Sequence, residues 1–383
     1  MSLQIARIKG IPIRLHFTLI IVFFLISWTL ATSFMPEFFP ELSSIEYWAM
    51  GIAGAFLLFV SVLLHELSHS IVAMKYGINV RQIILFIFGG VSDIEEEPKT
   101  PRKELEISFA GPATSFALSA IFALSWWVVS TLLPGGPKVI EGVLFYGAFL
   151  NALLGGFNLI PAFPLDGGRL LRATLVKRNQ NFDQATRTAA KVGIAISYVF
   201  MGIGFFIMFT GSFLGGIWLL LIGWFLQSGA QSYLYQHDIT AILSKVRLEE
   251  IMNPRVISIP YETDLDASLK SYFGAYMKSA FPVTDEQNRL VGMVTLKNVT
   301  AVPENRRQDT TVQEIMVPAA KLVIMDSDRR ADEALMQMAR TGVGKVFVCN
   351  AGGRLLGVVS KTDILEAASE RREFAESLGE QKR

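Results

Sequence analysis

The sequence is poor in cysteine and in charged residues. One cysteine, Cys349, among 383 residues excludes an intramolecular disulfide and suits a reducing, cytoplasmic setting. Only 18% of the residues are charged and the net charge is +1, so nothing indicates a nucleic-acid partner. Apolar residues are abundant instead: 51% are hydrophobic, and the mean hydropathy is +0.40. These values exclude an ordinary soluble protein and predict a membrane protein with a soluble part.

Long apolar runs fill the chain up to about residue 234. Each of them reaches the length of about 20 residues that a helix needs to cross a bilayer. The first run has no small-residue cleavage site, so we expect it to be retained as a membrane span. The composition therefore predicts a polytopic α-helical membrane domain with about six transmembrane helices. The runs cover residues 15–34, 48–74, 106–133, 139–160, 188–210 and 213–234.

Lysine and arginine in the short connections predict the orientation, because they concentrate on the cytoplasmic side. Of the two sides, one holds only Lys138. We therefore expect a multi-pass protein with both termini in the cytoplasm. The residues on the cytoplasmic side are Arg7, Lys9, Arg14, Lys75, Arg81, Lys99, Arg102, Lys103, Arg169, Arg172, Lys177, Arg178, Arg187 and Lys191.

Two segments on the cytoplasmic side interrupt the helical pattern. Residues 81–98 are apolar and rich in β-formers but too short to span, and Gly89-Gly90 suits a turn. We expect a membrane-associated β-hairpin there, sheltered by the helices because lipid does not tolerate exposed strand edges. Residues 158–171, NLIPAFPLDGGRLL, end the fourth span and begin a short helix, with Asp166 close to membrane depth.

The second span contains the motif H-E-x-x-H. Positions i and i+4 share a helix face, so His65 and His69 can hold one metal ion while Glu66 acts as general base. Two histidines and a third protein ligand, with one open position, make a catalytic Zn²⁺ site. At the helical rise, the two histidines lie about 15 and 9 Å below Lys75, which marks the cytoplasmic boundary. Ionisable groups at such depth are costly and usually functional, which favours catalysis over a packing role.

A third metal ligand is needed, and Asp166 in PLDGG is the best candidate by depth and side of the membrane. The alternative role for Asp166 is to cap the helix that begins at Gly167, which is a common use of aspartate. Beside an intramembrane H-E-x-x-H, we predict that Asp166 is a ligand.

These motifs resemble a known family. H-E-x-x-H in an early span, followed about a hundred residues later by N-x-x-P-x-x-P-x-D-G-G-R (158–169), resembles the site-2 protease family of intramembrane zinc metalloproteases. FAGP (109–112) and RIKGIPIRLHFT (7–18) look like its bacterial and archaeal branch, which implies a prokaryotic plasma membrane. The resemblance implies one catalytic Zn²⁺ on His65, His69 and Asp166, with Glu66 activating water.

The resemblance also implies roles in substrate binding. Asn158 would help to hold the scissile peptide or its oxyanion, as an amide donor can. The alternative is that Asn158 satisfies the broken end of the fourth span. The hairpin around Gly89-Gly90 resembles a β-element of the family whose edge receives an unwound substrate strand. The alternative is a purely structural hairpin.

The composition becomes that of a soluble α+β protein beyond residue 236, and an internal repeat appears. Met252 and Pro254 recur as Met316 and Pro318, and LVGMVTLKNV (290–299) recurs as LLGVVSKTDI (355–364). This offset is too long for a solenoid and suits two small domains packed as a pair. We therefore divide the chain into a transmembrane metalloprotease domain (1–236), two repeats (237–306 and 307–368) and a charged tail (369–383).

The repeats look like tandem CBS domains, whose clefts often bind adenosine nucleotides such as ATP or AMP. In the second copy Ser360, Thr362 and Asp363 match the nucleotide-binding end motif, with Asp363 on the ribose hydroxyls. In the first copy Asn298 replaces that aspartate, which puts a first site in doubt. The alternative is a pair that only dimerises or binds a partner, and CBS pairs commonly favour homodimers.

The leading hypothesis is an intramembrane zinc endopeptidase. It would cut a membrane-anchored protein near the cytoplasmic face of the bilayer and release a soluble fragment. The CBS pair would tune this activity through nucleotide level or oligomeric state. One alternative is a CBS-regulated transporter or channel, which predicts polar residues spread along several spans. Another is an inactive scaffold, which the intact Glu66 disfavours.

Overall fold

A computed structural model describes residues 2–87, 89–98, 100–133, 136–178 and 180–380, with side chains as far as residue 374. Contacts divide the chain into two compact units, residues 1–234 and 235–383. The division lies within helix α8 (Phe213–Leu243), which continues beyond the last predicted span. As far as Glu380, the predicted charged tail belongs to helix α14 (Lys361–Glu380).

Six helices within the described residues are long and apolar enough to cross a membrane, which confirms the predicted spans. The second of them begins at a capping box in which Ser43 and Glu46 satisfy each other's backbone amides. Large apolar side chains such as Phe24, Trp127 and Phe206 are exposed on the helix surfaces, as lipid contact requires. The six cover Thr18–Phe38 (α1, a π-turn and α2), Ser44–Lys75 (α3), Pro101–Leu132 (α4), Lys138–Asn158 (α5), Phe182–Thr210 (α7) and Phe213–Leu243 (α8).

The predicted hairpin is present, but it is half of a larger sheet. Strands β3 (Val80–Phe86) and β4 (Gly89–Ile94) are antiparallel, and β3 also pairs in parallel with β2 (Ile11–His16). Strand β1 (Ser2–Ile8) completes the order β1-β2-β3-β4, which leaves β4 at an edge. The first span, predicted from about residue 15, therefore begins slightly later, at Thr18, because Ile11–His16 form a strand.

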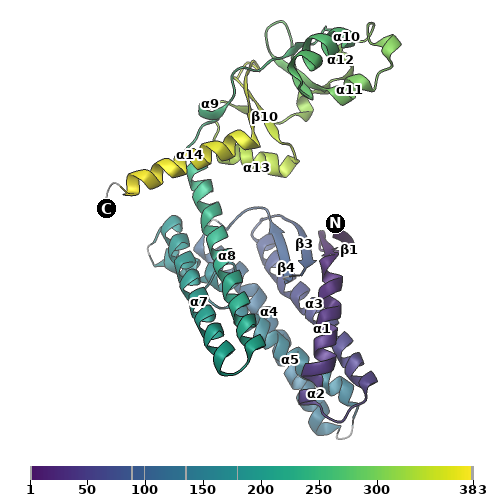
Figure 1. Ribbon diagram of the computed structural model, residues 1–383, viewed down its shortest axis with the longest axis vertical. Coiled ribbons are helices and arrows are strands. Elements are labelled where there is room, and N and C mark those ends of the chain that lie inside the picture. The colour runs from purple at the N-terminus through teal and green to yellow at the C-terminus, as the bar shows by residue number, and fades with distance from the viewer. Residues whose placement is uncertain (1, 88, 99, 134–135, 179, 381–383) are drawn as a thin grey trace. The chain divides into compact units, whose positions relative to one another are not determined.

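This sheet packs against helix α3, beside which β3 and β4 lie in Figure 1. Their shared core contains Ile83 and Leu85 from β3 and Val62 and Leu67 from α3. Alternate residues of β3 point to this core, as the period of a strand requires. The hairpin is thus sheltered by a helix on one face.

Helix α6 (Asp166–Lys177) follows the proline-containing loop and begins with the D-G-G sequence. A Cβ at Gly167 would lie 2.2 Å from the carbonyl oxygen of Ile160, and a Cβ at Gly168 would lie 2.6 Å from the amide nitrogen of Phe163. Only glycine permits so close an approach. The two glycines therefore let the loop fold over the start of α6 and place Asp166.

The second unit is an α+β pair in which the two repeats exchange strands. Strand β8 comes from the second repeat but pairs with β7 of the first, and Asn253 bridges to Val358 in return. The first repeat contains α9 (Leu248–Ile251), β5 (Ile259–Pro260), α10 (Leu265–Ser268), β6 (Ala280–Thr284), β7 (Leu290–Thr295) and α11 (Leu296–Thr300). The second contains α12 (Val312–Ile315), β8 (Val317–Pro318), β9 (Ile324–Asp326), α13 (Ala331–Thr341), β10 (Lys345–Cys349), β11 (Leu355–Ser360) and α14.

The repeated methionines explain the repeated glycines. A Cβ at Gly292 would lie 2.6 Å from Met316 Sδ, and one at Gly357 would lie 2.8 Å from Met252 Sδ. Each methionine therefore packs onto a glycine of the other repeat. The methionines and glycines that recur in the sequence repeat therefore form the contact between the two repeats.

Candidate metal centre

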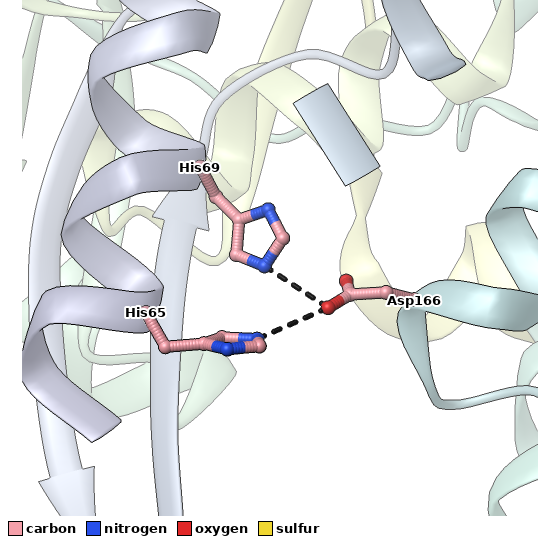
Figure 2. A group of neighbouring side chains, drawn as sticks. All are labelled: His65, His69 and Asp166. Atoms are coloured by element: carbon pink, nitrogen blue, oxygen red, sulfur yellow. Dashed lines mark hydrogen bonds and ion pairs between the residues drawn. The ribbon is translucent and has the colours of Figure 1, made fainter. Parts of the chain in front are cut away.

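Three predicted ligands converge in the first unit. Helix α3 presents His65 and His69 on one face, and the first residue of α6, Asp166, points at both (Figure 2). Asp166 Oδ2 lies 3.1 Å from His65 Nε2 and 3.0 Å from His69 Nε2. Both histidines are buried, and one atom from each of the three side chains lies within 4.8 Å of the others. The i, i+4 spacing and the D-G-G turn thus bring together the residues that the sequence singled out.

Helix α4 fixes the orientation of both rings through their other nitrogens. His65 Nδ1 lies 2.8 Å from the hydroxyl of Ser115, and His69 Nδ1 lies 2.7 Å from the carbonyl oxygen of Ile107. A carbonyl can only accept, so His69 Nδ1 carries a proton and donates it. Such partners are typical of metal-binding histidines, because they direct the opposite nitrogen at the ion.

The donor chemistry fits a cation at this point. With its proton on Nδ1, a neutral His69 ring turns an Nε2 lone pair toward Asp166 Oδ2, which is also an acceptor. Two acceptors at this distance are held together by a cation or a proton between them. In a tetrahedral site with Zn²⁺–ligand bonds near 2.1 Å, ligand atoms are about 3.4 Å apart. The observed separations of 3.0 and 3.1 Å are about 0.3–0.4 Å shorter, so the three side chains need only a small outward shift to take up an ion.

A glycine of α4 keeps the space in front of the two histidines open. A Cβ at Gly111 would lie 2.2 Å from His69 Nε2 and 2.5 Å from His65 Nε2. Any side chain here would fill the position that an ion needs. Gly111 belongs to the FAGP segment, in which the sequence alone did not indicate a part in the metal centre. Ile107 contacts His69 through its backbone carbonyl, so the identity of its side chain could not predict this contact.

Asp166 does not act as a helix cap here. The capping residue of α6 is Leu165, and no side-chain hydrogen bond caps this helix. The helix is anchored instead by Arg172, whose Nε donates to Glu104 Oε1 of α4 at 2.7 Å and whose Nη1 donates to the Tyr233 hydroxyl at 2.6 Å. Arg172 and Glu104 are 2% and 1% exposed. A buried ion pair therefore ties the helix of one ligand to the helix that orients the other two.

Glu66 and Asn158 lie close to the centre in sequence but make different contacts. Glu66 Oε2 accepts a hydrogen bond of 2.8 Å from Ser92 on β4. Asn158 Nδ2 donates to the carbonyl oxygen of Leu154, one turn earlier in α5, at 2.9 Å. In this structure Asn158 thus bonds to its own helix, and its role in substrate binding stays a prediction.

The three predicted nucleotide-binding residues line one cavity in the second unit. Ser360, Thr362 and Asp363 border a space of about 590 Å³. Asp363 Oδ2 accepts from the Ser360 amide at 2.7 Å, so it caps α14 in this structure. In the first copy, the Asn298 side chain likewise accepts from the Thr295 amide, at 3.2 Å. Three cationic side chains also line the cavity: Arg255, Lys278 and Lys345.

Both units of the chain match known protein families. Residues 53–134 and 136–200 match the family model of Peptidase family M50, and residues 248–304 and 312–370 match that of the CBS domain. Zinc metalloprotease MJ0392 of Methanocaldococcus jannaschii is 35% identical over 373 residues, which covers 96% of this chain and 96% of the relative. Rip3 of Mycobacterium tuberculosis is 32% identical over 365 residues, which covers 95% of this chain and 92% of the relative.

A solved structure, the site-2 protease from Methanocaldococcus jannaschii, is 33% identical and covers 61% of this chain and 95% of its own, with a TM-score of 0.41. The relatives thus extend over the membrane unit and the repeats alike, and the metal centre lies within the segment that matches the peptidase family. The chain therefore belongs to peptidase family M50, the site-2 protease family of zinc metalloproteases, and carries a tandem pair of CBS domains.

Proposed function

We propose that this multi-pass membrane protein is an intramembrane endopeptidase that cuts a membrane-anchored protein near the cytoplasmic face. The observation that carries the proposal is the convergence of His65, His69 and Asp166 beside Glu66, within helices long enough to span a bilayer. The distribution of lysine and arginine supports cytoplasmic termini, and the bacterial and archaeal relatives support a prokaryotic plasma membrane. Cleavage at this depth would release a soluble fragment into the cytoplasm.

The side chains divide the chemistry between them. His65 Nε2, His69 Nε2 and Asp166 Oδ2 would hold one Zn²⁺, which supplies Lewis acidity toward the scissile carbonyl when bound. The Glu66 carboxylate takes a proton from the attacking water and passes it to the nitrogen of the leaving amine. Asn158 would hold the substrate, for which its amide must leave the Leu154 carbonyl. The free edge of β4 would pair with an unwound substrate strand.

The decisive test is Glu66→Gln in the full-length protein. We expect about one zinc per chain to remain, and cleavage of a tethered reporter in proteoliposomes to fall by about 10²–10⁴-fold, the usual share of a general base. Glu141→Gln is the matched control, because Glu141 pairs with Lys138 on the side expected to face away from the cytoplasm. Unchanged cleavage in Glu66→Gln would rule out the proposed base. Loss of zinc would make Glu66 a ligand instead.

We also propose that the CBS pair binds an adenosine nucleotide and forms a homodimer. The cavity at Ser360, Thr362 and Asp363 supports nucleotide binding, because Arg255 and Lys345 border it and suit a phosphate chain. Asp363 would accept hydrogen bonds from the ribose hydroxyls. Bound nucleotide would then tune proteolysis through the pair.

Calorimetric titration of the full-length protein with ATP and with AMP tests this second proposal. We expect Asp363→Ala to weaken binding at least tenfold, whereas Asp309→Ala, outside the cavity, should leave binding unchanged. If neither nucleotide binds the wild type, the pair has only an assembly role. Light scattering in detergent would then show whether it forms dimers.

A further inference from the structure

Strand β4 touches the proposed general base at two points. A Cβ at Gly90 would lie 2.6 Å from Glu66 Cγ, so the backbone of β4 packs directly on this side chain. Two residues further, the Ser92 hydroxyl lies 2.8 Å from Glu66 Oε2. Residues two apart in a strand face the same side, so both contacts belong to the face that meets α3. The strand therefore confines the middle of the Glu66 side chain and holds its end.

The hydrogen bonds around Ser92 assign its proton to the carboxylate. Ser92 Oγ lies 2.8 Å from Glu66 Oε2 and 3.1 Å from the backbone oxygen of Glu66. A hydroxyl has one proton to donate, and the charged, closer oxygen is the stronger acceptor. The fully buried Ser70 hydroxyl lies 3.2 Å from Ser92 Oγ but 3.0 Å from the backbone oxygen of Glu66, so its one proton goes to that closer oxygen. The Ser92 proton therefore has the Glu66 carboxylate as its acceptor.

A glutamate needs such a contact if it is to act as a base. Its side chain has three rotatable bonds, whereas proton transfer requires an oxygen within about 2.6–3.2 Å of the reacting water. The contact with Ser92 Oγ occupies Oε2 and fixes the carboxylate plane. The other oxygen, Oε1, is left for the proton that the base takes up.

We propose that Ser92 is a positioning residue that holds Glu66 in the orientation needed for proton transfer. This inference rests on the proposed function, since it assigns Ser92 a part in the same reaction. Strand β4 is also the edge of its sheet. The strand whose free edge would receive the substrate therefore carries the residue that orients the base.

Kinetics of the zinc-loaded, full-length protein in proteoliposomes test the inference. We expect Ser92→Ala to lower kcat at least tenfold, with KM and zinc content within twofold of the wild type. Ser92→Thr keeps the hydroxyl on a residue that suits strands, so it should recover most of kcat. The matched control is Ser125→Ala, because the half-buried Ser125 donates to the carbonyl of Ile121 in its own helix, away from the metal centre. Equal kcat in Ser92→Ala and the wild type overturns the proposal, and so does a loss that Ser92→Thr does not recover.

Infrared spectroscopy can detect the hydrogen bond between Ser92 and Glu66 without measuring turnover. The difference spectrum between the wild type and Glu66→Gln isolates the carboxylate band of Glu66. Loss of the hydrogen bond in Ser92→Ala should shift this band, and an unshifted band overturns the proposal whatever the kinetics show. A wild type no faster than Glu66→Gln overturns the proposed function, and the role of Ser92 with it.

Discussion

The ion pair between Arg172 and Glu104 offers a prediction whose size follows from burial. Arg172→Met keeps much of the side-chain volume but removes the charge, which leaves Glu104, 1% exposed, without its cation. Breaking a buried pair in this way costs about 3–5 kcal/mol, because the remaining charge stays desolvated. Replacing both partners, as in Arg172→Met/Glu104→Leu, should restore most of the loss, since the other carboxylate on Arg172, that of Glu97, is 60% exposed and stays hydrated. Arg178→Met, at the exposed end of the same helix, should change stability by less than about 0.5 kcal/mol.

Tryptophan fluorescence during denaturant titration in detergent measures this effect for the membrane unit. All 6 tryptophans of the chain lie before residue 235, so the CBS pair does not contribute to the signal. Zinc content should fall together with stability in Arg172→Met, because α6 carries Asp166 at its first residue. An Arg172→Met protein within 1 kcal/mol of the wild type would refute this reasoning. A double variant less stable than the single variant would also refute it.

Three further predictions concern the ligands and the soluble unit. Asp166→Ala should abolish zinc retention after dialysis while the far-ultraviolet circular dichroism is unchanged; full retention would exclude Asp166 as a ligand. Gly111→Ala should lower zinc affinity at least tenfold in competition with a chelator, because its methyl group would lie 2.2 Å from His69 Nε2; equal affinity would mean that the ion lies elsewhere. Burial raises the pKa of the Cys349 thiol to about 11, with Asp326 adding to the rise. Since the unfolded thiol ionises near pH 8.5–9, the contribution of Cys349 to stability should be fully present below that pH and should decline as pH rises toward 11, by about 1.5 kcal/mol at pH 10. Thermal unfolding of the CBS pair should show this decline, and a Cys349→Ala protein with the same slope would contradict it.

The parts of the fold that the sequence predicts are those imposed by strong local constraints. Lipid forces the spanning segments to be helical, so hydropathy alone located them. The spacing of His65 and His69 puts them on one helix face, and the depth of Asp166 singled it out. Membership of the M50 family also favours a metalloprotease over the alternative of a transporter or channel.

What the sequence did not predict depends on contacts between distant segments. Strand β2 pairs in parallel with β3, so that Ile13 faces Ile83, and no local period reveals such a partner. The same holds for Ser115 and Gly111, which matter only because α4 packs across the two histidines. A backbone acceptor such as the Ile107 carbonyl is present at every residue, so no sequence can indicate which one is used.

The pairing of strands between the two CBS repeats makes each repeat depend on the other. Because β8 of the second repeat extends the sheet of the first, while Asn253 of the first repeat bridges to β11 of the second, neither copy is a complete domain. Deleting one repeat would leave the other with an unpaired sheet edge. It would also expose the methionine and the glycine that pack against the deleted repeat. We therefore expect the two copies to unfold together. If a nucleotide binds at Asp363 as proposed, we expect both repeats to respond to it, because their sheets are paired with each other.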